Sequence, residues 1–156
     1  LFGVPYDRIE VVVHPQSIVH SMVQYHDGAV KAQLGAPDMH LPIQYAFSYP
    51  YRLKSDFPRI SFSEISALTF ERPDTRRFRN LELAYRALSE GGSMPCVLNA
   101  ANEICVSAFL RDEVGFLRMS DIIEKTMDMV PCEKNPTLDD YMRIDLEARK
   151  VASSLL

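Results

Sequence analysis

The pattern of apolar and polar residues changes along the chain, from strand-like in the first third to helical in the second half. Apolar and β-branched runs predict three strands, at Ile9 to Val13, Ile18 to Tyr25 and Ala29 to Leu34, the first of them largely buried. Asp27-Gly28 separates the last two runs, and this dipeptide supplies the positive φ angles that a tight turn needs. The pattern therefore predicts an antiparallel hairpin in which the last two runs pair.

A short helix and a loose connection follow the hairpin. Met39 to Tyr49 predicts the helix, with Pro42 in its first turn, where the missing N–H costs little. From Pro50 to Pro73, prolines and serines recur without a regular period. This texture indicates a connecting segment, with room for one short strand at Ala67 to Phe70.

From Asp74 onward, apolar residues recur every three to four positions, which is typical of amphipathic helices. The stripe from Phe78 to Leu88 predicts the first helix, and Gly91-Gly92 ends it. Ser93 is the expected cap of the second helix, with Pro95 inside its first turn.

Two further helices complete the predicted second half. Gly115 breaks the second helix, and Ser120 is the expected cap of a third helix over Asp121 to Met129. Thr137 opens the fourth, which we expect to end near Ala152. Short loops between four helices predict a small helical bundle. Taken with the hairpin, the residues predict an α+β chain.

Composition and charge exclude several classes of protein. Hydrophobic residues make up 47% and charged residues 24%, as in an ordinary globular protein. The formal charge of -4 gives no basic footprint for nucleic acid, and no apolar run approaches the ~18 residues of a membrane-spanning helix. Some arginines do cluster, where a solvated helix start is favoured over a phosphate site: Arg72, Arg76, Arg77 and Arg79.

The three cysteines, Cys96, Cys105 and Cys132, are widely spaced and form no C-x-x-C pair. Neither a zinc knuckle nor a redox dithiol is therefore supported, and reduced, mostly buried thiols in a cytosolic-type protein are the simple interpretation. The chain begins Leu1-Phe2-Gly3, without a methionine or a signal peptide. We therefore expect a fragment or a processed product of a longer protein.

Histidine is the candidate proton-transfer residue, and all four histidines lie in the first half: His14, His20, His26 and His40. A strand histidine such as His20 could donate to a developing oxyanion, but an ordinary hydrogen-bonded histidine remains the alternative. His14 and His20 would share a face of a regular strand, which Pro15 interrupts. Without a third ligand or a carboxylate nearby, the histidines give little support for a metal site.

The remaining motifs do not complete a catalytic apparatus. The six glycines form neither G-x-G-x-x-G nor a P-loop. Asp145 and Glu147 diverge on a helix, so a solvated face is favoured over a metal site. Asn99 and Asn102 share a helix face, where a structural tie between the bundle and a loop is favoured over ligand binding.

An ordered set of motifs resembles the 1-deoxy-D-xylulose 5-phosphate reductoisomerase family over nearly the whole chain. The motifs are His14-Pro15-Gln16-Ser17-Ile18-Val19-His20-Ser21-Met22-Val23, Asp27-Gly28, Gln33-Leu34-Gly35, Pro37-Asp38-Met39, Leu68-Thr69-Phe70, Leu98-Asn99-Ala100-Ala101-Asn102-Glu103 and the helix from Asp145 to Ala152. Members of this family rearrange 1-deoxy-D-xylulose 5-phosphate and reduce the product with NADPH to 2-C-methyl-D-erythritol 4-phosphate, a step of non-mevalonate isoprenoid biosynthesis. A divalent cation, Mg²⁺ or Mn²⁺, polarises the oxygens of the substrate.

The resemblance implies a domain assignment. Residues 1–50 would end a central catalytic α/β domain with an antiparallel strand and hairpin segment, residues 51–73 would be a linker, and residues 74–156 would form a C-terminal helical bundle domain. The family's nucleotide domain, acidic metal ligands and phosphate-binding residues would precede Leu1. The chain alone should therefore bind neither NADPH nor metal and should be inactive. The resemblance also implies a homodimer through central-domain strands and a place in the cytoplasm of a bacterium or in a plastid.

The resemblance further implies site residues. His20 would be catalytic and lie near the sugar phosphate substrate, while Ser17, Pro37 and Met39 would lie beside the substrate and the nicotinamide. None of the four would be a metal ligand. Two alternatives remain open: a non-enzymatic module that dimerises or docks a partner, and a divergent reductoisomerase-like enzyme with another substrate.

Overall fold

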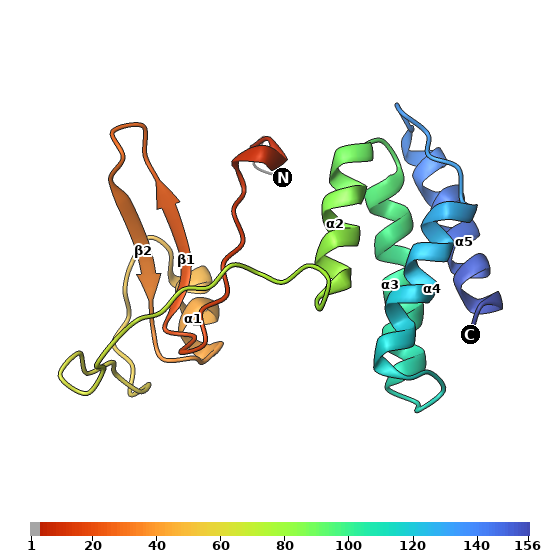
Figure 1. The fold of residues 1–156 in the computed structure, drawn as a ribbon. Helices are drawn as coiled ribbons and strands as arrows, with labels where there is room; N and C mark the ends of the chain where they lie inside the picture. The colour runs from red at the N-terminus through yellow and green to blue at the C-terminus, as the bar shows by residue number, and fades with distance from the viewer. Residues whose placement is uncertain (1–3) are drawn as a thin grey trace. The chain divides into compact units, whose positions relative to one another are not determined.

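The computed structural model describes residues 4–156. These residues divide into two compact units, one comprising Glu10–Pro73 and the other Asp74–Leu156 together with the described residues before Glu10. Residues 1–3, with which the predicted catalytic-domain segment begins, lie outside the described part. The first unit holds a β-hairpin and one α-helix, and the second holds four α-helices and the short 3-10 helix Tyr6–Arg8 (Figure 1). The predicted α+β class is confirmed.

The hairpin pairs β1 (Val19–Gln24) with β2 (Val30–Leu34) in antiparallel fashion, as predicted. Its turn closes where the Tyr25 N–H donates to the Ala29 carbonyl at 2.8 Å. Only Gly28 in this turn has a positive φ, of 85°. Asp27 contributes differently from the prediction, because its carboxylate accepts a hydrogen bond from the Ala29 N–H at 2.9 Å. A loop of this kind, with one left-handed glycine before the returning strand, is common in hairpins.

Two predicted strands of the first unit are wrong. Ile9 to Val13 forms no strand, and its residues are exposed or half-buried rather than largely buried. Ala67 to Phe70 forms none either, and the pairing occurs one residue later, as an isolated bridge between Val13 and Glu71. The bridge cannot extend into a ladder because Pro15, two residues beyond Val13, has no N–H to donate. A β-branched run therefore forms a strand only where a partner strand meets it.

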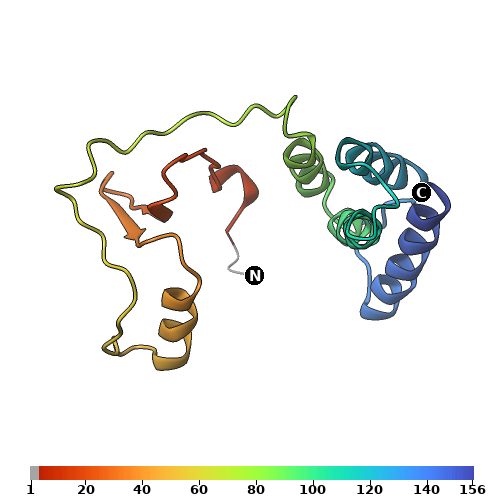
Figure 2. The same cartoon turned by 90° about the horizontal axis from the view of Figure 1, so that it is seen from below.

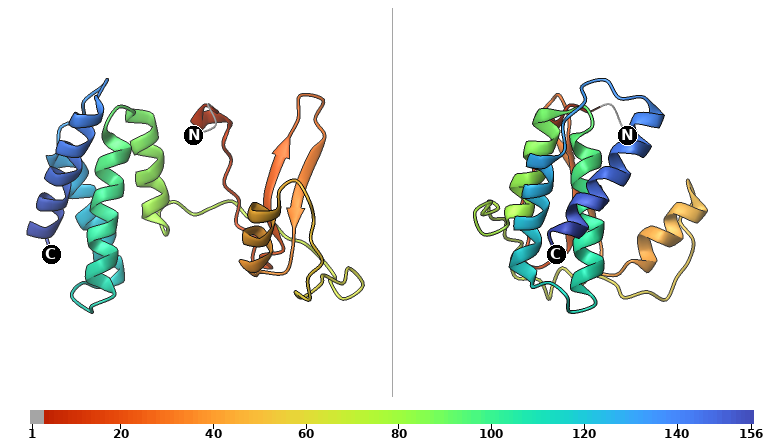
Figure 3. Two further views of the ribbon diagram at one scale, coloured as in Figure 1. Left: turned by 180° about the vertical axis from the view of Figure 1, so that it is seen from behind. Right: turned by 90° about the vertical axis from the view of Figure 1, so that its right-hand side faces the viewer.

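The helix α1 (His40–Ser48) lies within the predicted range of 39–49, with Pro42 in its first turn. The segment after it, over the described residues 51–73, contains no helix and no strand apart from the Glu71 bridge (Figure 3). The predicted lack of a regular period in this segment agrees with the structure, while the predicted short strand is wrong.

The second unit is a four-helix bundle formed by α2 (Arg79–Glu90), α3 (Met94–Phe109), α4 (Phe116–Met129) and α5 (Leu138–Ser154). The helix α3 packs against the other three, and Figure 2 looks nearly along it. Small residues of α3 line the centre of the core, with Ala100, Ala101 and Ala108 each 0% exposed. Larger side chains from α4 and α5, such as Ile122 and Ile144, fill the remaining space. Alternation of small and large residues allows helices to approach closely at interior packing density.

Two helix starts differ from the prediction. Ser93 does precede α3, but its hydroxyl accepts a hydrogen bond from the Glu133 N–H at 2.9 Å instead of capping its own helix. The helix α4 begins at Phe116, so Ser120 lies inside it and is not a cap. Gly115 takes the N-cap position instead. The apolar stripe of α4 starts earlier than predicted because Met119 is buried as well.

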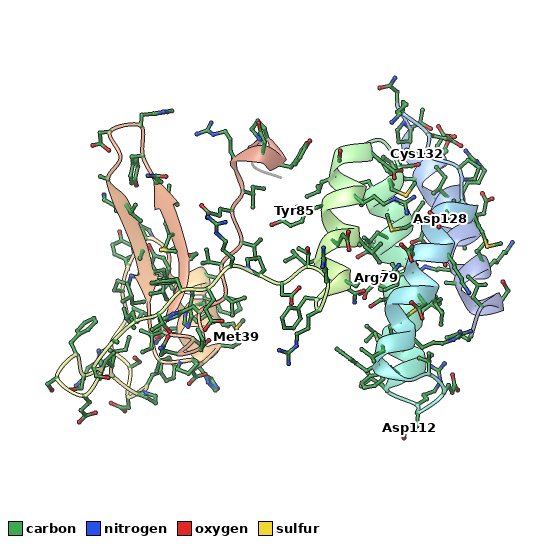
Figure 4. All side chains as sticks on the ribbon, viewed as in Figure 1. Met39, Arg79, Tyr85, Asp112, Asp128 and Cys132 are labelled. Atoms are coloured by element: carbon green, nitrogen blue, oxygen red, sulfur yellow. The ribbon has the colours of Figure 1, made fainter. Side chains whose placement is uncertain are left out.

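Ion pairs join α2 to α4 along their exposed edge. Arg79 pairs with Glu124 and lies 3.7 Å from the carboxylate of Asp121. Arg86 lies 2.7 Å from the carboxylate of Asp128, and the labelled Arg79 and Asp128 come from facing helices in Figure 4. Arg79, one member of the predicted arginine cluster, therefore pairs with carboxylates of α4, in line with the solvated helix start that was favoured over a phosphate site. Exposed pairs of this kind contribute little stability individually.

The start of α5 carries a capping box, which makes the stability of the bundle depend on pH. The Thr137 hydroxyl accepts from the Asp140 N–H, and the Asp140 carboxylate accepts from the Thr137 hydroxyl and N–H. These bonds, with help from Arg143, lower the pKa of Asp140 from 3.8 to about 2. A lowered folded-state pKa contributes stability above pH 3.8, and this contribution is lost as the pH falls through about 2.

As the pH falls from 3.8 to about 2, we expect the free energy of unfolding to decrease less in Asp140→Asn than in the parent chain. Thr137→Ala should cost about 1 kcal/mol at neutral pH, because it removes the capping hydroxyl. Urea unfolding of the chain at a series of pH values measures both effects. Asp139→Asn, in the same turn, is the matched control, and an equal change in that variant would contradict the assignment.

Candidate functional site

Ser17 ends a tight turn at the entrance to β1. The Ser17 N–H donates to the His14 carbonyl at 3.0 Å, which closes a four-residue turn through Pro15 and Gln16. Ser17 itself has a φ of 52°, in the left-handed region that residues with a side chain rarely adopt. Pro15 therefore breaks the strand regularity between His14 and His20, as the sequence predicts. Strained backbone of this kind persists only where its surroundings hold it, and it gathers at functional sites.

His20 lies at an irregularity of the hairpin. Val19 pairs with Leu34 and Ser21 pairs with Gln33, so the two strands change register between Val19 and Ser21. His20 is the additional residue, and such a β-bulge redirects its side chain out of the regular alternation. The ring is exposed at the open end of the hairpin. The bulge therefore gives His20 an orientation that strand periodicity does not predict.

The His20 ring contacts the turn that precedes it. Its Nε2 atom lies 3.1 Å from the Ser17 carbonyl oxygen. A carbonyl can only accept a hydrogen bond, so Nε2 carries the proton and, in the neutral ring, Nδ1 carries the lone pair. Within the described residues, Nδ1 has no hydrogen-bond partner. The arrangement leaves one nitrogen of the ring available to an external group.

Gly35 lies under the His20 ring at the end of β2. It is buried, and its N–H donates to the Ile18 carbonyl at 3.0 Å. A Cβ atom at this position would lie 3.5 Å from both Cε1 of His20 and Cδ2 of Leu41. A side chain at Gly35 would therefore lie in van der Waals contact with the Cε1–Nδ1 edge of the ring.

The loop after Gly35 carries the other two predicted site residues. Pro37 is exposed, and Met39, at the start of α1, is 69% exposed (Figure 4). Asp38 holds the loop, because its carboxylate accepts from the His40 N–H at 3.0 Å and from the His40 ring at 2.5 Å. The backbone hydrogen bond from His40, reinforced by the ring, lowers the pKa of Asp38. Asp38 is thus a structural carboxylate at the start of α1.

The structure brings the predicted residues to one end of the hairpin. Ser17 and His20 are in direct contact, and the Gly35 N–H ties β2 to the residue between them. Pro37 and Met39 follow on the same loop, although neither makes a hydrogen bond to the His20 side chain among the described residues. The open end of the hairpin is therefore the candidate site, and His20 is the proton-transfer residue predicted for it.

Sequence reasoning missed the residues that hold the turn. The Gln16 amide and the His14 ring both bind Thr69, and the His14 ring stacks on Phe70 at 4.7 Å between centroids. These partners are more than fifty positions apart, and no periodicity links them. The only sequence signal for these contacts was that Leu68-Thr69-Phe70 is one of the motifs that resemble the family.

The acidic and amide side chains of the helical bundle make structural contacts among the described residues. Over residues 4–156, no group of three or more His, Cys, Asp or Glu side chains could hold an ion. Asp145, one half of the D-x-E motif, instead binds Arg149 at 2.7 Å, in line with a structural surface role. Asn99 donates to Glu103 of its own helix at 3.2 Å, so its predicted tie to a loop is wrong. No step that passes through a metal or a cofactor is assigned to this chain.

The cysteines and the helices add no further chemistry. All three cysteines are free thiols, and Cys105 is buried while Cys96 and Cys132 are half-buried. Burial raises the pKa of the Cys105 and Cys96 thiols, which disfavours the reactive thiolate. None of the described helices is long and apolar enough to cross a membrane.

Comparison with known proteins links the chain to one group of enzymes. A sequence profile described as the DXP reductoisomerase C-terminal domain matches residues 34–151. The 1-deoxy-D-xylulose 5-phosphate reductoisomerase of Phocaeicola vulgatus is 65% identical over 156 residues, which is 100% of this chain and 41% of that protein. The enzyme of the same name from Bacteroides fragilis is 63% identical over 156 residues, again 100% of this chain, and 40% of its own length.

Solved structures show the same likeness. The 1-deoxy-D-xylulose 5-phosphate reductoisomerase from Zymomonas mobilis in complex with NADPH has a TM-score of 0.86 and 43% identity, covering 99% of this chain and 41% of that one. A DOX-P reductoisomerase in complex with NADPH, fosmidomycin and magnesium has a TM-score of 0.79 and 34% identity, covering 92% of this chain and 38% of that one. The chain thus spans about 40% of the length of the curated relatives it matches.

Proposed function

The chain belongs to the DXP reductoisomerase family, and on this premise we propose that it is the carboxy-terminal part of an enzyme that converts 1-deoxy-D-xylulose 5-phosphate to 2-C-methyl-D-erythritol 4-phosphate. The observation that carries the proposal within the chain itself is the contact between Ser17 and His20. A bulged strand and a strained turn present one ring nitrogen of His20 at an open edge. Irregular backbone that re-aims a proton-transfer residue is a frequent feature of active sites.

His20 acts on the substrate through Nδ1. Its Nε2 is occupied by the Ser17 carbonyl, so Nδ1 is the atom that accepts a hydrogen bond from a substrate hydroxyl. Ser17 orients the ring through its carbonyl oxygen. Pro37 and Met39, on the loop after β2, supply exposed apolar surface suited to the carbon skeleton of a small sugar or to a nicotinamide ring.

NADPH would supply the hydride of such a reaction, and Mg²⁺ or Mn²⁺ would act as the Lewis acid. The described residues supply neither a carboxylate cluster nor a phosphate cradle, so both groups are assigned to the part of the enzyme outside this chain. In this proposal, residues 1–50 end the catalytic domain, residues 51–73 link it onward and residues 74–156 form the C-terminal domain. A bacterial cytoplasm or a plastid is the expected location.

Purified protein tests the activity directly. The complete enzyme should oxidise NADPH only when 1-deoxy-D-xylulose 5-phosphate and a divalent cation are both present. The 156-residue chain alone should do so under no condition. Absence of turnover by the complete enzyme would overturn the proposed substrate. Turnover by the chain alone would overturn the assignment of the cofactor and metal sites to the missing part.

We further propose that the hairpin takes part in a homodimer. Apolar side chains project from both strands, and Met22, Val23 and Val30 are 44%, 58% and 54% exposed. A two-stranded sheet with such surface is marginally stable alone and gains from pairing or burial. Sedimentation of the complete enzyme should show a dimer that Val23→Lys weakens. An unchanged dimer in that variant would place the interface elsewhere.

A further inference from the structure

We propose that Gln16 and Thr69 are positioning residues for His20, acting through the carbonyl group of Ser17. This inference rests on the proposed function, because it assigns a purpose to residues that do not themselves reach the candidate substrate edge. The orientation of the His20 ring then depends on Thr69, which is more than fifty positions away from Gln16 in the sequence.

The Gln16 side chain makes an unusually complete contact with Thr69. Its Nε2 donates to the Thr69 hydroxyl at 2.8 Å, while its Oε1 accepts from the Thr69 N–H at 3.3 Å and lies 3.2 Å from the hydroxyl. The backbone N–H must face an oxygen, so it defines which way the amide is turned. The amide therefore meets Thr69 in one orientation only, much as a neighbouring strand would.

Neighbouring contacts reinforce this clasp, which we define as the contact of residues 13–16 with residues 69–71. The His14 Nδ1 lies 2.8 Å from the Thr69 carbonyl, so all three polar groups of Thr69 are engaged by the turn. Val13 and Glu71 exchange two backbone hydrogen bonds of 2.9 Å. Individually exposed hydrogen bonds are weak, but several between the same two segments hold both in one geometry.

The clasp leads directly to the candidate site. Gln16 precedes Ser17, whose backbone is held in the left-handed region with a φ of 52°. The carbonyl of that strained residue is the acceptor for Nε2 of His20. Without the hydrogen bonds between Gln16 and Thr69, Ser17 would relax to an ordinary φ, and the Ser17 carbonyl would turn away from the His20 ring. His20 would then lose the partner that holds its orientation and its proton position.

A purely structural role is the alternative, in which the clasp only ties the connecting segment to the hairpin. The two roles predict different kinetics. If the clasp positions His20, a substitution in it lowers kcat, and this effect disappears when His20 is removed. If the clasp is only structural, the substitution lowers stability, and its effect adds to that of any other substitution. A double-substitution cycle with His20 separates them.

The test uses the complete enzyme and the NADPH-oxidation assay. Gln16→Ala and Thr69→Val should each lower kcat by roughly tenfold to a hundredfold with a smaller change in KM, as expected when a reacting group is misplaced by about 1 Å. Thr69→Ser keeps the hydroxyl and should restore most of the rate. Gln33→Ala is the matched control, because its amide lies on the same hairpin and donates to the adjacent Leu34 carbonyl instead of to Thr69.

The decisive measurement is made in a His20→Ala background. There Gln16→Ala should lower kcat by less than about twofold, because the residue through which it acts is gone. A full additional loss in that background, or no loss in the presence of His20, would overturn the proposal.

NMR spectroscopy of the 156-residue chain tests this inference independently of the proposed function. The ring resonances of His20 should move in Gln16→Ala and remain in place in Gln33→Ala. If the complete enzyme shows no turnover, the proposed function is wrong. The ring resonances alone then show whether the clasp positions His20. Unmoved resonances in Gln16→Ala would overturn it even if the enzyme is active.

Discussion

Replacing His20 by alanine in the complete enzyme is expected to lower kcat/KM by about 10²-fold to 10⁴-fold, the usual loss when a general acid–base group is removed. The reason is the geometry of the ring, whose Nε2 is held by the Ser17 carbonyl while Nδ1 is left for the substrate. The exposed ring is not part of a packed core, so thermal unfolding should change little. Steady-state NADPH oxidation measures the first effect and circular dichroism the second.

Two isosteric replacements identify the working nitrogen of His20. Asparagine places a polar group near the position of Nδ1, and glutamine places one near Nε2. His20→Asn should therefore retain more activity than His20→Gln. His26, an exposed residue beside the hairpin turn, provides the control, and His26→Ala should leave kcat/KM within roughly twofold of the parent. A His20→Ala enzyme as active as the His26→Ala enzyme would remove His20 from the mechanism.

Replacing Gly92 by alanine should destabilise the helical bundle by at least about 3 kcal/mol. Gly92 has a φ of 55°, which costs a residue with a side chain about 1–2 kcal/mol. A Cβ atom there would overlap the Glu133 carbonyl oxygen and lie 3.0 Å from Cα of Lys134. Both neighbours are backbone, so the loop before α5 would have to move as a whole.

Moving that loop would break its hydrogen bonds to Ser93, which is 0% exposed. The Ser93 N–H donates to the Glu133 carbonyl at 2.8 Å, and the Ser93 hydroxyl accepts from the Glu133 N–H at 2.9 Å. Leaving a buried polar group unpaired costs about 1–3 kcal/mol, which adds to the strain. Chemical denaturation of the 156-residue chain measures the total.

Gly115→Ala is the matched control for this prediction. Gly115 has a φ of -76°, and a Cβ atom there would meet nothing within 4 Å. Its replacement should cost less than about 1 kcal/mol, the modest penalty of a poorer N-cap. Equal losses in the two variants would show that the loop before α5 is not packed on Gly92 as described.

Sequence motifs predict some features of the candidate site, and the structure alone shows the others. Ser17, His20, Pro37 and Met39 were predicted through family resemblance, and the structure places them at one end of the hairpin. Their roles stay predictions. The bulge at His20 and the clasp on Thr69 could not be predicted, because both depend on which residues of distant segments meet. Local periodicity carries no information about such pairings.

The sequence alone determined the family, the hairpin, α1 and the existence of four helices in the second half. These features depend on local signals: a turn glycine at Gly28, an apolar stripe along each helix and a helix start at Thr137. Such signals act over a few residues, so the chain shows them without its tertiary contacts.

Only the tertiary structure decided where strands end and what individual polar side chains do. Val13 pairs with Glu71 for one residue and no further, although its neighbours are as β-branched as those of a true strand. Ser93 binds the loop before α5 instead of its own helix, and Asn99 binds Glu103. In each case several partners are sterically accessible to the same side chain or backbone group, and the folded chain brings one of them within hydrogen-bond distance. His20 follows the same rule, because its direction depends on the register shift of the hairpin and on the turn that Thr69 contacts.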